Sequence, residues 1–352
     1  MASMSAFRAV AVASLFVSGS AWAAEIREFS LFGATPPALL ARPLELPASP
    51  LERPEPAPQV QEARRPPSTG KIVALAGAYQ AGVAGAGYLM WWKGRGLGTF
   101  VAKSEGWFGP ETYAGGADKT SHFVFGYLGS RAFRSGYEAI GVEPRAARLL
   151  GGASGVLGAW AVELGDGFSE YRFSWEDGLI TSAGAAAAVL LTEADLDDTL
   201  RFRWGKVPHR TPKDPWSPEP NKAPSHYSAE ITTMDLSLAG LLPRVGARPG
   251  LARFLLVSAT YATKGFSSIR PQAVERQVGL EVGLDLYEVA RAAGVSDRSF
   301  WGGTLLFALR HFRVPFTGVG IRYEVGSHRF HGPDFGDRFY GDVSLPPPSP
   351  LP

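Results

Sequence analysis

The 352-residue sequence contains no cysteine. It can therefore form no disulfide, no thiolate metal site and no cysteine nucleophile, and it has no cysteine that could carry a lipid after an export signal. Neither sign of charge dominates, because the net charge is +2 with 19% charged residues, so no basic surface indicates nucleic acid as a partner. A phosphate-binding glycine loop, a Gly-x-Ser-x-Gly nucleophile elbow and a zincin motif are also missing.

The N-terminus has the pattern of an export signal. Arg8 precedes the apolar run "AVAVASLFVSGSAWA", which ends in a small-x-small cleavage pattern. We expect residues 1–24 to be a secretory signal peptide; the alternative is an uncleaved anchor helix. Residues 25–70 are rich in proline, which removes hydrogen-bond donors, so they are predicted to form a disordered tether. The predicted location is the periplasm or an envelope membrane.

Residues 71–204 are predicted to form a helical domain of about four helices. The stretch "KIVALAGAYQAGVAGAGYLMWWKGR" is apolar and ends in tryptophan and basic residues, a pattern typical of a membrane boundary. The alternative is a buried helix of a soluble bundle. Residues 118–136, 144–165 and 175–191 are further helices rich in glycine and alanine. Small residues allow helices to approach closely, which predicts a compact bundle that is embedded in a membrane or lies at its surface.

Five titratable residues lie near the ends of these helices: Asp118, His122, Glu163, Asp166 and Asp177. Asp118 and His122 are four residues apart, so they share a helix face. Taken singly, each carboxylate has an ordinary explanation as a charge at a helix end, and His122 as a core histidine. Taken together, they are candidates for one polar cluster, because buried charges are costly unless they are paired. Such a cluster could be catalytic or could only join helices.

Three blocks in this region, "DKTSHF", "ELGDG" and "SWEDGLITSAG", resemble the YfiM-type family of predicted bacterial periplasmic proteins of unknown function. The resemblance runs from about residue 118 to residue 191, and a more distant similarity connects it to VanZ-like membrane proteins. It implies an envelope location and no established reaction. This sequence departs from the pattern at Thr181, where asparagine or aspartate is usual, and at Val162, where lysine is common. The positions that match the family are Asp118, Lys119, His122, Glu163, Asp166, Ser174, Trp175, Asp177 and Gly184.

The C-terminal half changes to a period of two, which predicts strands and an α+β fold: a helical bundle followed by a small antiparallel sheet. Residues 205–227 are a proline-rich loop, 228–342 the strand-rich domain and 343–352 a disordered tail. Strands are expected near 229–238, 253–262, 278–286 and 319–325, with helical connections at 287–293 and 300–312. At 278–286, the apolar side chains are expected to face the core. Val282→Asp should then cost several kcal/mol and Glu281→Ala almost nothing.

The segment "SHRFHGPDFGDRFYG" contains His328, His331, Asp334 and Asp337, which could ligate a metal. The alternative is an exposed, turn-rich tail, because Gly332-Pro333 and Gly336 interrupt any rigid element.

Two functions remain open. The first is a membrane-associated envelope protein of unknown activity that is structural or binds a lipid or a protein partner, its polar residues fixing helix pairing. The second is a membrane-proximal enzyme acting on a lipid or cell-wall intermediate, with His122 as the acid/base and the carboxylates tuning it or binding a divalent cation. An envelope lipid is the expected partner; cofactor and protein partner are unknown. A histidine within about one hydrogen bond of a carboxylate and facing a cavity would favour the enzyme, whereas groups that each cap a helix or face water would favour the first function.

Overall fold

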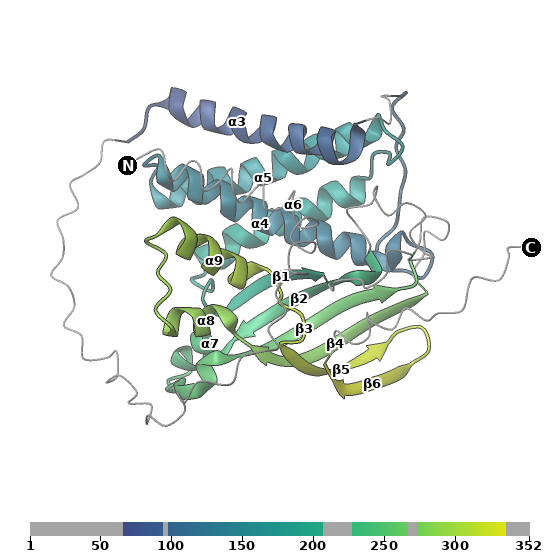
Figure 1. The fold of residues 1–352 in the computed structure, drawn as a ribbon. Helices are drawn as coiled ribbons and strands as arrows, with labels where there is room; N and C mark the ends of the chain where they lie inside the picture. Colours follow the sequence, from purple (N-terminus) through teal and green to yellow (C-terminus); the bar gives the residue numbers. More distant parts are fainter. Residues whose placement is uncertain (1–65, 94–97, 207–226, 267–273, 336–352) are drawn as a thin grey trace, which may run out of the picture.

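A computed structural model describes residues 66–93, 98–206, 227–266 and 274–335. The predicted α+β class is confirmed, because a helical region is followed by a six-stranded antiparallel sheet (Figure 1). The predicted signal peptide, nearly all of the tether, most of the 205–227 loop and the C-terminal tail lie outside the described residues. The predicted domain boundary at residue 204 falls within the first strand.

The helical region contains four long helices that match the predicted ones within a few residues. Pro144 stands at the first position of its helix, and Glu143 accepts hydrogen bonds from the backbone N–H groups of Arg145 and Ala146. The first helix continues into a π-helical turn, and a short 3-10 turn precedes the second. The elements are α3 (Thr69–Gly87), the π turn Tyr88–Trp92, the 3-10 turn Ala114–Gly116, α4 (Ala117–Ala139), α5 (Pro144–Gly167) and α6 (Trp175–Glu193).

Glycines bring α4 and α6 into backbone contact. A Cβ at Gly184 would lie 1.8 Å from the carbonyl oxygen of Phe123, and one at Gly126 would lie 1.9 Å from that of Thr181. Neither position can hold a larger residue without moving the helices apart. This close approach sets the distance between the N-terminal turns of α4 and α6, where the candidate site lies.

The sheet is a simple meander in which each strand pairs antiparallel with the next, in the order β1-β2-β3-β4-β5-β6. The strands are β1 (Leu200–Lys206), β2 (Glu230–Ser237), β3 (Leu255–Lys264), β4 (Glu275–Leu284), β5 (Gly318–Glu324) and β6 (Arg329–Asp334). The connections hold α7 (Leu238–Arg244), α8 (Leu286–Ala292), α9 (Phe300–His311) and the 3-10 turns Tyr227–Ala229 and Gly250–Phe254. The four predicted strands and both predicted helical connections are therefore present, and β1 and β6 were not anticipated.

Helix α4 packs against the β1 end of the sheet. The ring of Phe202 lies 4.8 Å from that of Phe123 and 5.4 Å from that of Tyr127, measured between centroids. At the start of β2, the Glu230 carboxylate accepts hydrogen bonds from Ser121 and from the indole of Trp204. The helical region and the sheet thus share one interface, with α3 on the side of the helices away from the sheet (Figure 1).

The polarity of β4 is the reverse of the predicted one. Val282 is 52% exposed and Leu280 58%, whereas Glu281 is 5% exposed and pairs with the buried Arg313 at 2.8 Å. Gln277 is also buried. The prediction that the valines and leucines of 278–286 face the core was wrong, because alternation distinguishes two faces without saying which one is covered. The strand also ends at Leu284, and Leu286 begins α8.

None of the helices in the described residues combines the length and apolar character needed to cross a membrane. Helix α3 lies at the surface of the helical region, and of its residues only Tyr79 and Gly87 are buried. Its interior polar residue, Gln80, donates a hydrogen bond to the carbonyl oxygen of Ser154 on α5.

Candidate acid/base site

A buried lysine lies at the centre of the candidate site. The side chain of Lys119 is 0% exposed, and its Nζ lies 2.6 Å from Asp177 Oδ1, 2.8 Å from Asp118 Oδ2 and 2.9 Å from Glu105 Oε2. The three carboxylates come from the first turn of α6, the first turn of α4 and the loop before α4. A single ammonium group therefore neutralises charges from three separate segments, which is the condition under which buried charges are tolerated.

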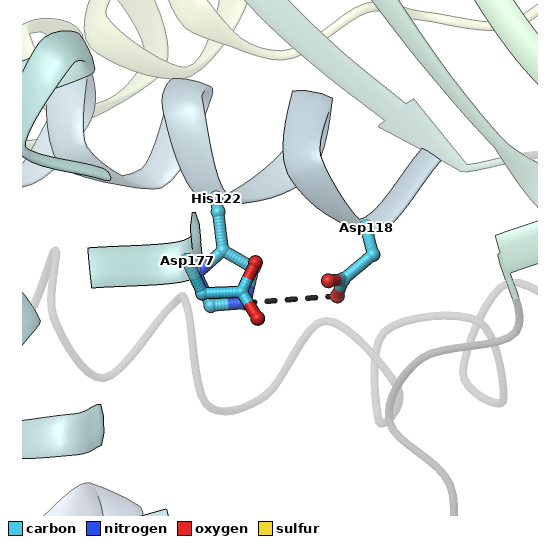
Figure 2. A group of neighbouring side chains, drawn as sticks. All are labelled: Asp118, His122 and Asp177. Atoms are coloured by element: carbon cyan, nitrogen blue, oxygen red, sulfur yellow. Dashed lines mark ion pairs between the residues drawn. The ribbon is translucent and has the colours of Figure 1, made fainter. Parts of the chain in front are cut away.

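His122 lies on the same side of α4 as Asp118, one turn further along. Its Nε2 is 3.6 Å from Asp118 Oδ1, and its Nδ1 is 3.0 Å from the hydroxyl of Thr181 on α6. In Figure 2 the carboxylate of Asp177 overlaps the imidazole, and the dashed line marks the ion pair between the imidazole and Asp118. The ligand atoms of these three residues lie within 4.8 Å of one another. The side chain of His122 is 28% exposed, against 4% for Asp118 and 7% for Asp177. Of these three side chains, the imidazole is therefore the most exposed.

The other two predicted residues, Glu163 and Asp166, lie at the C-terminal end of α5 and have partners of their own. Glu163 Oε2 accepts a hydrogen bond of 3.2 Å from the backbone N–H of Ser174, and Asp166 Oδ1 accepts one of 2.6 Å from the Trp92 indole. Both carboxyls are near enough to interact electrostatically with His122. They form an outer part of the cluster and do not touch the imidazole directly.

Local sequence positions these groups by standard helix capping. Ser174 caps α6 by accepting a hydrogen bond from the backbone N–H of Asp177. The carboxylate of Asp177 does not close the capping box but turns to Lys119, and Glu163 accepts the Ser174 N–H instead. Gly116, with φ of 90°, allows the chain to turn sharply into α4 just before Asp118.

Burial raises the pKa of Asp177, and it brings the pKa of three other carboxyls in the cluster close to neutral pH. The pKa of Glu105 rises to about 7, through burial and the neighbouring Asp118. The pKa of Glu163 rises to about 8, with burial as the largest cause. Burial likewise raises the pKa of Asp166 to about 6, although the Trp92 hydrogen bond opposes it. These groups exchange protons near neutral pH, as acid/base residues must.

Asp118 and His122 are shifted in the opposite sense, so that the pKa of each favours its charged form. Burial alone would raise the pKa of Asp118, but Lys119 and His122 outweigh it and hold the pKa well below its ordinary value. Burial would lower the pKa of His122, but Asp177 and Asp118 outweigh it and raise the pKa to about 9. At neutral pH, His122 is therefore an imidazolium beside an ionised Asp118. Neighbouring titratable groups that are shifted in opposite directions are typical of functional sites.

Sequence reasoning missed Glu105, Tyr227 and the roles of Lys119 and Thr181. Glu105 lies in a loop that is held by hydrogen bonds between Phe173 and residues 101 and 103. Tyr227, next to β2, donates a hydrogen bond to Asp118 Oδ1 across 109 residues of sequence. Thr181, which departs from the family pattern, still offers a hydroxyl to His122 Nδ1. Lys119 carried a signal, since it stands between two candidate residues in "DKTSH".

Among the described residues, Asp118, His122 and Asp177 form the one group whose ligand atoms could hold a metal ion, since these atoms lie within 4.8 Å of one another. Oxygen and imidazole ligands suit several divalent cations. The Lys119 ammonium, however, already lies against both aspartates, at 2.8 and 2.6 Å. A cation would compete with it for the same oxygens, so the residues present fit proton transfer better than metal binding.

The suggested ligands near the C-terminus are engaged elsewhere. His331 lies 3.6 Å from Glu324, and Asp334 pairs with Arg322 at 3.0 Å. His328 Nδ1 lies 2.6 Å from the hydroxyl of Tyr323. Asp337 lies outside the described residues. The contacts of this segment are those of a hairpin formed by β5 and β6.

Comparison with known proteins gives a family match over the helical region. Residues 104–193 match the model of a family described as a predicted periplasmic lipoprotein (DUF2279). The match confirms the resemblance to a family of predicted periplasmic proteins and the exported, periplasmic or envelope location; the VanZ-like similarity stays a prediction. No curated protein and no solved structure matches the chain. The matched region includes the five predicted site residues, Lys119 and Glu105, but not Tyr227.

Proposed function

We propose that this envelope protein associates with a membrane and carries an acid/base site that acts on a lipid or cell-wall intermediate. One observation carries the enzymatic part. The side chain of His122 is partly exposed. Asp118 and Asp177, which stabilise its positive charge, are buried, and each forms an ion pair with Lys119. The 3.6 Å between Nε2 and Asp118 Oδ1 is longer than a hydrogen bond, so the enzymatic proposal is supported by the partial exposure of the imidazole together with its buried carboxylate neighbours.

In this proposal His122 is the general acid. Its raised pKa, about 9, keeps Nε2 protonated at neutral pH, and the contact between Nδ1 and Thr181 fixes the orientation of the ring. Water attacks the substrate atom at which the bond is cleaved, the imidazolium donates the Nε2 proton to the leaving oxygen, and the neutral imidazole takes up the proton that the attacking water releases. Asp118 and Asp177 stabilise the imidazolium. Glu163, with a pKa of about 8, is the second group able to exchange a proton near neutral pH.

A second candidate is that the cluster only joins structural elements. The observation that favours it is the number of segments that the cluster connects. Asp118 alone contacts Lys119, His122 and Tyr227, and Lys119 reaches the loop at Glu105 and α6 at Asp177. In this case the protein is a structural or partner-binding component of the envelope.

Membrane association is supported by the family description and by the many large apolar side chains exposed in the described residues, on helices and strands alike. The test is fractionation of cells followed by extraction with salt. A protein that is held through apolar contacts stays with the membrane in high salt, and a protein held by charge is released. Recovery of the whole protein in the soluble periplasmic fraction would contradict this part of the proposal.

The acid/base proposal is tested by comparing the wild type with His122→Gln. Both proteins are incubated with a total lipid extract of bacterial envelopes, and the lipids are compared by mass spectrometry. A product formed by the wild type and lost in the variant, with circular dichroism showing that the variant is still folded at the assay temperature, supports catalysis. His328→Gln is the matched control, because that histidine lies in the β5–β6 turn. If the wild type and His122→Gln leave the same lipids, the acid/base proposal is wrong for lipid substrates and the structural candidate stands.

A further inference from the structure

The centre of the sheet has one face made only of apolar side chains. Strand register places them in two adjacent rows that run across the sheet. The rows are Leu200, Leu236, Val257, Val282 and Val319, and next to them Phe202, Met234, Ala259, Leu280 and Ile321. Helix α4 covers the β1 end, while the large side chains of these rows on β3, β4 and β5 are exposed, as is Met234. A continuous patch of this kind, unlike single exposed residues, marks a contact surface.

The opposite face of the same strands carries charge and is buried. Arg203 donates to the Asp235 carboxylate, which also accepts a hydrogen bond from Ser258. Arg313 reaches both oxygens of Glu281, at 2.8 and 3.0 Å. A sheet that faces water on one side normally turns its polar side chains outward. Here the exposed face is the apolar one, so its contact with water is unfavourable.

An aromatic margin borders the patch. The third row of the same face contains Tyr261, Val278 and Tyr323, and it meets Phe330 on β6. Tyr261 contacts the loop before α4, where Trp107 and Phe108 are exposed. Tyrosine and tryptophan at the margin of an apolar surface are typical of the boundary between lipid and water.

We propose that this face, the apolar sheet face of β2–β5, lies against the lipid of a bacterial envelope membrane. The two rows carry no charge that a protein partner would have to match. The matched family is described as lipoproteins, and because this sequence contains no cysteine, apolar side chains are the groups to which we assign contact with lipid. Helix α3 is a weaker surface, because its exposed residues are mostly glycine and alanine, which bury little area.

The surface also bears on the proposed function, because the loop that forms its aromatic margin supplies Glu105 to the acid/base site. Because one loop contributes to both, a membrane that contacts the sheet face would lie close to the acid/base site. This placement suits a substrate that is itself an amphiphile of the membrane. The inference rests on the proposed membrane association but not on the chemistry assigned to His122.

The absence of cysteine makes a direct test possible. Single variants of the full chain, Leu280→Cys and Ile321→Cys, are labelled with a polarity-sensitive fluorophore and mixed with vesicles of phosphatidylethanolamine and phosphatidylglycerol. We expect a blue shift with a several-fold rise in emission for both. Leu251→Cys, 78% exposed in the turn before β3, is the matched control and should not respond. Circular dichroism checks that each variant is folded, and either sheet variant suffices for the test.

Three results would overturn the inference. If Val73→Cys on α3 responds to vesicles and the sheet variants do not, α3 is the membrane surface and membrane association stands. If the sheet variants respond to rising protein concentration without vesicles, the face binds a second copy of the chain. If no labelled position responds, or the Leu251→Cys control responds equally, the face has no specific contact with lipid, and cell fractionation decides membrane association separately.

Discussion

The sharpest prediction compares two neighbouring residues of β4 that point to opposite faces. Glu281 is buried, and both of its oxygens bind Arg313, which is itself buried. Glu281→Ala takes away the carboxylate that contacts Arg313 at 2.8 and 3.0 Å, and removing one partner of a buried pair costs about 3–5 kcal/mol. Val282 is half exposed, so Val282→Asp forfeits only part of the burial of one valine, about 1 kcal/mol or less.

Both free energies of unfolding are measured by urea denaturation in buffer without lipid or detergent, where the two variants should differ by about 2 kcal/mol or more. The double variant Glu281→Ala/Arg313→Ala should recover part of the loss, because it also removes the buried guanidinium group that contacted Glu281. A loss for Val282→Asp that equals or exceeds the loss for Glu281→Ala would show that the apolar face of β4 is the covered one, and would remove the basis of the lipid-facing surface.

Three further predictions concern the helical region. Lys119→Met should lower the free energy of unfolding by about 3–5 kcal/mol at pH 7, and by less in acid, where the carboxyls become protonated. If urea denaturation gave the same loss relative to the wild type at both pH values, Lys119 would not act as a counter-ion. Because the pKa of His122 is raised from 6.5 to about 9, its stabilisation is complete below pH 6.5 and is lost as the pH rises through 9. The difference in unfolding free energy between wild type and His122→Gln, up to about 3 kcal/mol, should shrink over that range, and a constant difference would show that the ring is neutral in the fold. Gly184→Ala should lower the free energy of unfolding by about 1–3 kcal/mol, because the added Cβ would meet the backbone of Phe123. Gly129→Ala, with open space around it, is the control and should be neutral or slightly stabilising. Equal melting temperatures for the two variants would refute the close approach of the helices.

The helices were predictable because each carries its own signals. Pro144 and Ser174 mark helix starts, and small residues mark the faces where helices meet. The pattern of titratable residues also identified groups that the fold brings together, since a spacing of four fixes Asp118 and His122 on one helix face whatever else the chain does.

Two features were beyond sequence reasoning for physical reasons. Alternation along 278–286 states that the two faces of the strand differ, but burial depends on what packs against them, and the Arg313 partner of Glu281 lies 32 residues away. Glu105 and Tyr227 come from a loop and a turn with no periodicity, and they reach the site only after the whole chain has folded.

The hydrogen bond from Tyr227 to Asp118 has a thermodynamic consequence. It joins the segment that leads into β2 to a carboxylate at the start of α4, so the ionisation of Asp118 and the docking of that segment are coupled equilibria. Such coupling is reciprocal. The free energy by which the docked tyrosine favours the ionised form of Asp118 equals the free energy by which protonation of Asp118 weakens docking. A change in the charge of Asp118 therefore alters how firmly the segment at Tyr227 is held to α4, and displacement of that segment alters the pKa of Asp118.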